Sequence, residues 1–492
     1  MFNNLIISTL LFSLEKYGER NAFCIEGEYY SYARLKKRIA AVRKVLHNVS
    51  AENIGLVAND DLDTYASILA VWMEGKCYVP LHPDQPLDRC MDIITQVEIT
   101  TILDSSKSTR YRNNDVIITS TLNDENELLF PQKQTDNGLA YILFTSGSTG
   151  RPKGVPISRG NVAAFVDSVE KLGITLKPED RCLQMFDLTF DLSVQSYLLP
   201  LLAGACVYTV SYKEIKYQAV FALLDEYHLT AALMVPSVIH SLRPYMEEIN
   251  IPEMRYSLFC GEALNIDDAK AWYECVPNAN VWNMYGPTEC TIYCTAYRMR
   301  VFCADKQTNG NVCIGKAMPG VKTMVIDDKG IPCDTDVKGE LCLAGAQLTQ
   351  GYWKDEKKNK EAFFVADDGT RYYRTGDICS CDALGDIEYY GRKDSQVKVN
   401  GYRVELSEIE CVARNYYDGK MAVVAVVTDR GSGNTIKMAV EQAEGNNGFE
   451  LKSFLQSKLP SYMIPREIHF LKKFPQNTNN KIDRKLIKEI IG

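Results

Sequence analysis

Residues 143–154 read Leu-Phe-Thr-Ser-Gly-Ser-Thr-Gly-Arg-Pro-Lys-Gly and continue an apolar run, 139–144, that predicts a β-strand. The stretch contains three glycines and ends on Lys153-Gly154. Its four hydroxyl side chains are Thr145, Ser146, Ser148 and Thr149. Glycine backbones let N–H groups approach a phosphate closely, and the hydroxyls and the lysine add donors. The spacing does not fit the Walker A loop. Composition alone favours a flexible Gly/Ser loop, and the preceding strand and the closing lysine are the features that point instead to a polyphosphate cradle.

Segments typical of strands and helices alternate on both sides of this stretch. Strands are expected at 53–58, 77–80 and 203–210, and helices at 65–73, 159–172 and 218–227. Such alternation predicts an α/β fold, a large N-terminal domain of parallel-type sheets with helices. Short alternating runs separated by Gly, Pro and Asp between residues 315 and 390 predict a β-rich subdomain within it.

The last part of the chain has a pattern of its own. From Asp394 onward come an apolar strand at 421–427 and a helix near 451–459, with a slight excess of basic over acidic residues. We therefore expect a body at residues 1–393 and a small mobile α+β domain at residues 394–492.

Composition excludes several classes of protein. The chain has 492 residues, 46% hydrophobic and 24% charged, and a net charge of -8, which matches a globular protein without the clustered cations of a nucleic-acid binder. Its 16 cysteines show no disulfide or C-x-x-C spacing and predict reduced thiols. No run reaches the ~20 apolar residues that span a bilayer, and the apolar run 5–14 predicts a first helix and not a signal peptide. A cytoplasmic protein that binds neither nucleic acid nor membrane is expected.

The 143–154 stretch resembles the phosphate loop of the adenylate-forming superfamily, the acyl- and aminoacyl-activating enzymes. Further motifs in that superfamily's order extend the resemblance over nearly the whole chain. They lie at 30–38, 74–80, 283–289, 339–345, 373–377, 391–405, 459–465 and 480–484.

The resemblance implies a site for ATP and Mg²⁺. Asn283 and Tyr285 would meet adenine, Asp377 and Arg392 would bind ribose or phosphate, and Glu289 would bind the metal. A packed core tyrosine is the alternative for Tyr285, and solvated loop charges are the alternative for Asp377 and Arg392. The implied nucleotide-binding set is Thr145, Ser146, Ser148, Thr149, Lys153, Gly261, Glu262, Asn283, Tyr285, Thr288, Asp377, Arg392 and Lys481.

Three of these residues have implied catalytic roles: Thr145, Glu289 and Lys481. Lys481 would bridge the substrate carboxylate and the α-phosphate while the carboxylate attacks in line and pyrophosphate leaves. Without the resemblance, a lysine in this polar C-terminal stretch would be interpreted as a solvated charge.

Asp191, in Phe190-Asp-Leu-Ser193, favours an amino acid as substrate. The resemblance implies that this carboxylate holds the α-ammonium group, which fatty and aryl acids lack; a helix N-cap is the alternative. The other pocket positions are Leu192, Gln195, Ser237, Leu258, Cys260, Met284, Ile292 and Tyr293. Residues 190–193 and 258–264 are similar to the D-alanine:carrier-protein ligases, where a cysteine at position 260 narrows the pocket. Gln195 and Tyr293 depart from that pattern, so another amino acid stays open.

The second step implied by the resemblance is transfer of the aminoacyl group to the phosphopantetheine thiol of a separate carrier protein. Asp394 would be the hinge about which the C-terminal domain swings. Because the chain ends soon after the lysine motif, a freestanding enzyme is expected, and the resemblance implies a monomer. An acyl-CoA synthetase for fatty or aryl acids and a non-enzymatic protein on the same scaffold are the competing interpretations.

Overall fold

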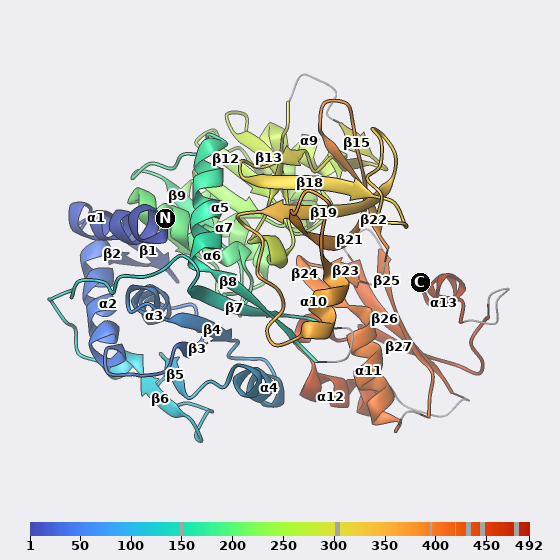
Figure 1. Cartoon of the computed structure of the whole chain (residues 1–492), viewed down its shortest axis with the longest axis horizontal. Helices are drawn as coiled ribbons and strands as arrows, with labels where there is room; N and C mark the ends of the chain where they lie inside the picture. Colours follow the sequence, from blue (N-terminus) through green and yellow to red (C-terminus); the bar gives the residue numbers. More distant parts are fainter. Residues whose placement is uncertain are drawn as a thin grey trace. The chain divides into compact units, whose positions relative to one another are not determined.

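Two compact units make up the chain in the computed structural model (Figure 1), which describes residues 1–147, 151–300, 306–393, 396–418, 420–429, 434–442, 448–476 and 482–492. The first unit comprises residues 1–83, 94–143 and 154–393. The second comprises residues 84–93, 144–153 and 394–492. Two short segments that the sequence placed in the body, including the glycine-rich stretch, therefore group with the C-terminal residues.

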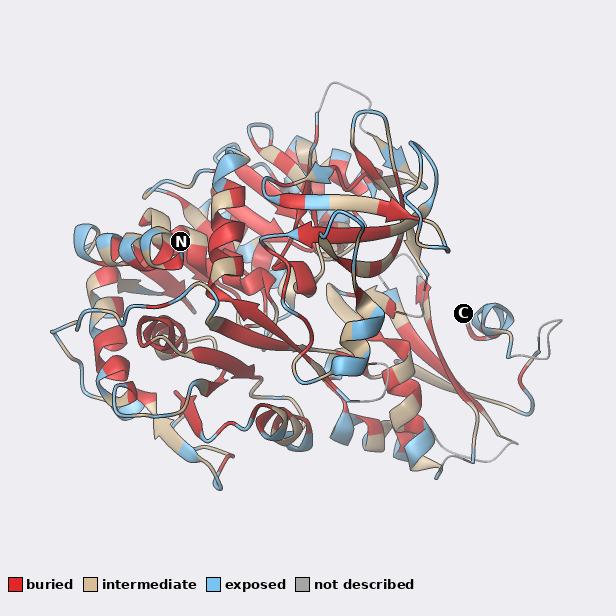
Figure 2. Ribbon diagram, viewed as in Figure 1, coloured by how far each residue is buried: buried red, intermediate tan, exposed pale blue. Residues whose placement is uncertain are grey.

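A nine-stranded sheet carries most of the side chains that the sequence singles out. Its order is β17 (Lys316–Ala317), β14 (Thr295–Arg298), β13 (Asn280–Tyr285), β12 (Tyr256–Phe259), β11 (Ala231–Met234), β9 (Arg181–Gln184), β10 (Cys206–Thr209), β1 (Asn21–Ile25) and β2 (Glu28–Ser31). The strands from β13 to β1 are parallel, and β2, β14 and β17 pair antiparallel at the edges. Figure 2 shows many of the first unit's strands as buried, which explains their continuous apolar runs.

Helices connect the strands of this sheet. From β9 to β13 the connecting helices are α6 (Leu192–Ala203), α7 (Lys216–Tyr227), α8 (Pro236–Leu242) and α9 (Ile266–Cys275), while α5 (Arg159–Lys171) leads into β9, and α1 (Ser8–Lys16) and α2 (Tyr32–Leu46) lie earlier in the chain. The α5 helix begins in a capping box, in which the side chains of Ser158 and Asn161 each accept the other residue's backbone N–H. The helices expected at 159–172 and 218–227 are thus confirmed.

A second sheet has the order β6 (Asp115–Ile118), β5 (Thr101–Asp104), β3 (Asn53–Val57), β4 (Cys77–Leu81), β7 (Leu139–Thr145) and β8 (Lys153–Ser158). The helices in this part of the sequence are α3 (Leu62–Met73) and α4 (Leu87–Val97). Asp61 caps α3 by accepting the N–H of Thr64 at 2.8 Å, and Gly75, at a φ of 71°, follows its end. The strand, helix and strand expected at 53–80 are confirmed.

The predicted β-rich subdomain is an antiparallel sheet. Its strands are β18 (Val321–Ile326), β19 (Gly339–Gly345), β20 (Phe363–Val365), β21 (Arg371–Cys381) and β22 (Ile387–Arg392). The short helix α10 (Glu356–Ala362) precedes β20, and a small pair, β15 (Gln307–Thr308) and β16 (Asn311–Val312), lies earlier in the chain.

The second unit has its own core. It contains the hairpin of β23 (Gln396–Val399) and β24 (Tyr402–Glu405), and a sheet of β25 (Val423–Asp429), β26 (Asn434–Glu441) and β27 (Glu467–Leu471). Its helices are α11 (Leu406–Tyr416), α12 (Gly448–Lys458) and α13 (Arg484–Ile491). Ile409, Met438 and Leu455 are fully buried in one apolar cluster, so this unit buries apolar surface without help from the first.

One predicted strand starts in the wrong place. The apolar run 203–210 was expected to be one strand, but Ala203 ends α6, and Gly204, at a φ of 78°, turns the chain before β10. An apolar run without a clear period does not distinguish the end of a buried helix from a strand. Within the described part of the chain, the fifteen cysteines are free thiols, and no helix has both the length and the apolar character needed to cross a bilayer.

Candidate active site

The predicted amino-acid pocket draws its residues from the carboxyl ends of four neighbouring parallel strands. The sheet order β13, β12, β11 and β9 places Met284, Leu258 with Cys260, Ser237 and the 185–191 loop at consecutive strand ends. In open α/β sheets this edge is where ligands bind. The structure therefore gathers residues that lie up to about a hundred positions apart in the sequence.

Asp191 occupies the N-cap position of α6, but its side chain makes no capping hydrogen bond. The alternative interpretation of this residue as a helix cap is thus not supported. The side chain is buried, with an exposed fraction of 7%, and its charge adds to the burial that raises the pKa of Tyr141 well above the usual value. A buried carboxylate is costly unless a cation compensates it.

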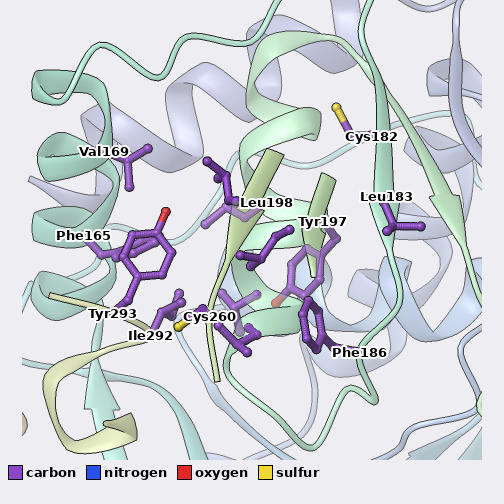
Figure 3. Close-up of a cluster of buried hydrophobic side chains, with 14 of the residues drawn as sticks. Phe165, Val169, Cys182, Leu183, Phe186, Tyr197, Leu198, Cys260, Ile292 and Tyr293 are labelled. Carbon is purple, nitrogen blue, oxygen red and sulfur yellow. The ribbon is translucent and has the colours of Figure 1, made fainter. Parts of the chain in front are cut away.

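Cys260, Ile292 and Tyr293 lie together in a cluster of buried apolar side chains (Figure 3). The Tyr293 ring is fully buried and meets Phe165 edge to face, with 4.9 Å between ring centroids. Burial, and then the nearby Cys260, raises the pKa of Tyr293. The Tyr293 hydroxyl and the side-chain oxygen of Gln195 are buried without a hydrogen-bond partner among the described residues. Leu192, Leu258 and Met284 are also buried.

Ser237 and Glu262 meet at the start of α8. The Ser237 backbone N–H donates to Glu262 Oε2 at 2.9 Å, and Gly261 adopts a φ of 97° that allows the chain to turn there. Glu262 was expected to contact the nucleotide. In this structure one of its carboxylate oxygens accepts a backbone N–H from the first turn of α8.

The predicted ribose-binding residues contact each other. The Tyr285 hydroxyl donates to Asp377 Oδ2, and Arg392 Nη1 donates to Asp377 Oδ1 at 2.9 Å. Asp377 and Arg392 face each other across the antiparallel pair of β21 and β22. Burial and the Asp377 charge raise the pKa of Tyr285 well above its usual range, so it stays a neutral donor.

Glu289 is fully buried and accepts a hydrogen bond from the Tyr352 hydroxyl at 2.7 Å. The Tyr352 hydroxyl also lies 3.3 Å from that of Tyr373. Among the described residues no group of three or more His, Cys, Asp or Glu side chains could hold a metal. A single carboxylate fits Mg²⁺ only where phosphates and waters complete the shell, as a nucleotide would supply.

Asn283 and Thr288 differ in how they are placed. The Asn283 amide nitrogen donates to the carbonyls of Val312 and Cys313, at 3.2 and 3.0 Å, so the expected contact with a base edge would have to use its carbonyl oxygen. Thr288 opens the short 3-10 turn that carries Glu289 and is half-buried.

Ser146 and Gly147 of the glycine-rich stretch contact residues of the second unit. Ser146 Oγ donates to the carbonyl of Arg403 and accepts the N–H of Glu405, both at 3.0 Å. The Gly147 N–H donates at 2.9 Å to Glu408 Oε2, whose other oxygen accepts from Arg89 at 2.7 Å. The Gly147 backbone N–H thus already donates a hydrogen bond to a carboxylate.

Two further observations concern the predicted phosphate contacts. Thr145 Oγ1, at the end of β7, is buried without a hydrogen-bond partner among the described residues, as a hydroxyl awaiting an acceptor would be. Lys153 begins β8 and is half-buried. A hydroxyl and a lysine of this kind fit a phosphate group, whereas the Gly147 N–H is already bonded to Glu408. Ser148, Thr149, Asp394 and Lys481 lie outside the described residues.

Sequence reasoning missed Tyr352, Gln347 and Glu408. Tyr352 and Gln347 contact the 289–293 segment, and Glu408 contacts Gly147. Each of these contacts joins residues more than 50 positions apart, so no local spacing in the sequence predicts it.

Residues 12–353 match the family described as AMP-binding enzyme. The chain is 30% identical over 483 residues to gramicidin S synthase 2 of Brevibacillus brevis, covering 96% of this chain and 11% of that protein. It is 29% identical over 483 residues to D-alanine--D-alanyl carrier protein ligase of Lactococcus lactis subsp. lactis (strain IL1403), covering 93% of each. The chain spans a similarly small part of other large synthases that it matches, 12% to 18% for three of them.

Solved structures share the fold. The Vibrio cholerae adenylation domain AlmE in complex with glycyl-adenosine-5'-phosphate has a TM-score of 0.87 and 26% identity, covering 99% of this chain and 97% of that one. PA1221, an NRPS protein containing adenylation and PCP domains, has a TM-score of 0.85 at 22% identity, covering 98% of this chain and 83% of that one.

Proposed function

Because the chain belongs to the AMP-binding enzyme family, whose adenylate-forming members are ATP-dependent enzymes, we propose that it activates an amino acid as an aminoacyl-adenylate. The substrate carboxylate attacks the α-phosphorus of ATP, the bond from that phosphorus to the bridging oxygen breaks, and pyrophosphate leaves. In a second step the thiol of a separate carrier protein's phosphopantetheine arm attacks the acyl carbonyl. A thioester forms, AMP leaves, and the thiol proton goes to solvent.

One observation carries the choice of an amino acid: Asp191 is buried at the strand edge where the pocket residues meet, and its side chain does not cap α6. A buried carboxylate attracts an ammonium group, and the α-ammonium group of an amino acid can pair with it. Fatty and aryl acids carry no such group.

The buried side chains of the proposed pocket favour an amino acid whose own side chain is small. The fully buried Tyr293 ring and its contact with Phe165 occupy space beside Cys260 (Figure 3). One relative is named for D-alanine, and the AlmE complex contains a glycyl adenylate, so both of those proteins handle small amino acids. We take D-alanine as the first candidate for this chain.

The residues of the predicted nucleotide site support the proposal that the enzyme uses ATP with Mg²⁺. Asp377, positioned by Tyr285 and Arg392, presents a carboxylate to the ribose hydroxyls, and Glu289 presents one to Mg²⁺. Bound Mg²⁺ would neutralise the departing pyrophosphate. The proposed role of Lys481 is to neutralise charge between the carboxylate and the α-phosphate, and that of Asp394 is to act as the hinge of the C-terminal residues. A monomer in the cytoplasm remains the expectation from sequence.

The test compares substrates that differ only by the amino group. Pyrophosphate exchange into ATP is measured with alanine and with propionate for the wild type, Asp191→Ala and Asp191→Asn. Removing one partner of a buried ion pair costs about 3–5 kcal/mol, so kcat/KM for alanine should fall by roughly 100-fold or more in both variants, while propionate gains relative to alanine.

Asp167→Ala is the matched control, because Asp167 is a carboxylate on α5 that pairs with Lys171 at the surface. It should behave as the wild type does. If Asp191→Ala keeps full turnover of alanine, and propionate or longer acids are the better substrates, the chain is an acyl-CoA synthetase and the proposal is wrong.

A further inference from the structure

The loop that joins β13 to β14 is closed tightly on itself. The Cys294 N–H donates to the Tyr285 carbonyl at 2.8 Å, and a Cβ added to Gly286 would lie 2.3 Å from the Tyr293 Cα. Only glycine permits this approach. The loop carries Glu289, assigned above to Mg²⁺, and Ile292 and Tyr293, assigned to the amino-acid pocket.

The middle of the loop has an unfavourable backbone conformation. Thr291 and Ile292 are consecutive residues with φ values of 52° and 72°, in the left-handed region. Both are β-branched, the residue type for which positive φ is most costly. Such a conformation persists only where the surroundings impose it.

Gln347 supplies that constraint. Its Nε2 lies 2.8 Å from the carbonyl oxygen of Tyr293 and 3.3 Å from those of Cys290 and Thr291. In return, Thr291 Oγ1 donates to the Gln347 carbonyl at 2.6 Å. Gln347 has an exposed fraction of 1%, so water does not compete for these bonds.

Glu289 is held by different groups. The Thr349 N–H donates to the Glu289 carbonyl at 2.8 Å, and the Tyr352 hydroxyl donates to the Glu289 carboxylate. The loop therefore has two supports, one under the metal-binding end and one, Gln347, under the end that lines the amino-acid pocket.

We propose that Gln347 is a positioning residue that holds the strained Thr291–Ile292 turn and thereby fixes Ile292 and Tyr293 as the wall that selects the amino-acid side chain. The inference rests on the proposed function for the identity of the pocket. Without Gln347 the turn relaxes toward negative φ, the Tyr293 ring leaves its contact with Phe165, and the amino acid is bound less tightly and less selectively.

The experiment compares Gln347→Glu, a nearly isosteric change that removes the donor, and Gln347→Leu with Gln134→Glu. Gln134 is the matched control, because it is a buried carboxamide in the same unit whose nitrogen also donates to a backbone carbonyl, that of Trp72. Pyrophosphate exchange gives KM for the amino acid and for ATP separately. Both Gln347 variants should raise the amino-acid KM by about tenfold or more and change the ATP KM by less than about twofold, whereas Gln134→Glu changes neither.

A second substitution, one that relieves the backbone strain at the Thr291–Ile292 turn, tests whether that strain matters. Thr291→Asn places a residue that tolerates positive φ at the turn, so in the Gln347→Leu background it should recover part of the lost amino-acid affinity. Equal rises in both KM values, or no recovery, would show a general loss of structure and overturn the proposal.

Hydrogen exchange separates this inference from the proposed function, because it needs no substrate. Peptides covering residues 286–298 should exchange faster in the Gln347 variants than in the wild type or Gln134→Glu. Unchanged exchange overturns the role of Gln347. If the wild type uses no amino acid at all, the proposed function fails, and the exchange result still decides whether Gln347 holds the turn.

Discussion

At the scale of single residues, Tyr293 is the side chain that we propose limits the size of the amino-acid pocket. Its ring is fully buried against Phe165, and its hydroxyl finds no hydrogen-bond partner among the described residues. The ring therefore fills volume, while the hydroxyl makes no hydrogen bond with any described residue.

Tyr293→Ala should enlarge the pocket. We expect kcat/KM in pyrophosphate exchange to fall for alanine and to rise for larger amino acids such as leucine, with a loss of about 3–5 kcal/mol in the free energy of unfolding from the cavity. Tyr293→Phe is the control: it keeps the ring, removes a buried hydroxyl that has no hydrogen-bond partner among the described residues, and should be as stable as the wild type or more stable. An unchanged substrate preference in Tyr293→Ala would show that Tyr293 does not line the pocket.

Short motifs were the signal by which the sequence singled out candidate site residues. Asp377 and Arg392 were singled out from two separate motifs, and the structure joins them in an ion pair. Gln347 was not found, because its role depends on contacts with residues more than 50 positions earlier and on backbone angles that composition does not reveal.

At the scale of elements, the start of α3 is linked to the segment that follows β9. Tyr65 donates to Asp60, Gln184 Nε2 donates to the Tyr65 hydroxyl at 3.2 Å and to the Phe186 carbonyl at 2.8 Å, and Lys216 pairs with Asp187 at 3.3 Å. These bonds fix the first residues of the 185–191 loop that ends at Asp191.

Asp60 makes stability depend on pH. Burial raises its pKa to about 8; Tyr65 and Lys216 oppose the rise, while Asp187 and Asp61 add to it. Since the unfolded carboxyl titrates near pH ~4, the folded protein holds an extra proton between about pH 4 and 8, and the free energy of unfolding falls as pH rises through that window. Asp60→Asn removes this dependence, so its stability advantage over the wild type should grow from low to high pH and level off above about pH 8.

Urea unfolding at about pH 5, 7 and 9 measures this advantage. Asp367→Asn, which changes an exposed carboxylate, is the control and should keep a constant offset from the wild type. The same offset at all three pH values for Asp60→Asn would contradict the assigned titration.

Elements with a clear period or a clear cap were predictable, as α3 and α5 show. The boundary between α6 and β10 was not, because the apolar run through Ala203 has no period and only the φ of Gly204 marks the turn.

At the scale of the whole molecule, the chain consists of two units with separate cores, and the glycine-rich stretch belongs to the second by its contacts. The sequence predicted a boundary at 393–394 from a change of pattern. It could not predict that residues 84–93 and 144–153 group with the last part of the chain, because that grouping depends on long-range contacts such as Arg89 with Glu408.

Single-turnover formation of an adenylate tests the central claim most directly. Enzyme in excess is mixed with ATP labelled at the α-phosphate, Mg²⁺ and D-alanine, and the products are separated. The wild type should form aminoacyl-AMP and pyrophosphate. Lys481→Ala should form it roughly 100-fold more slowly, as loss of a group that stabilises developing charge predicts, and Lys485→Ala, which changes an exposed lysine on α13, should match the wild type. Failure of the wild type to form an adenylate with D-alanine or any other amino acid, together with adenylate formation from an acid that lacks the amino group, would contradict the account.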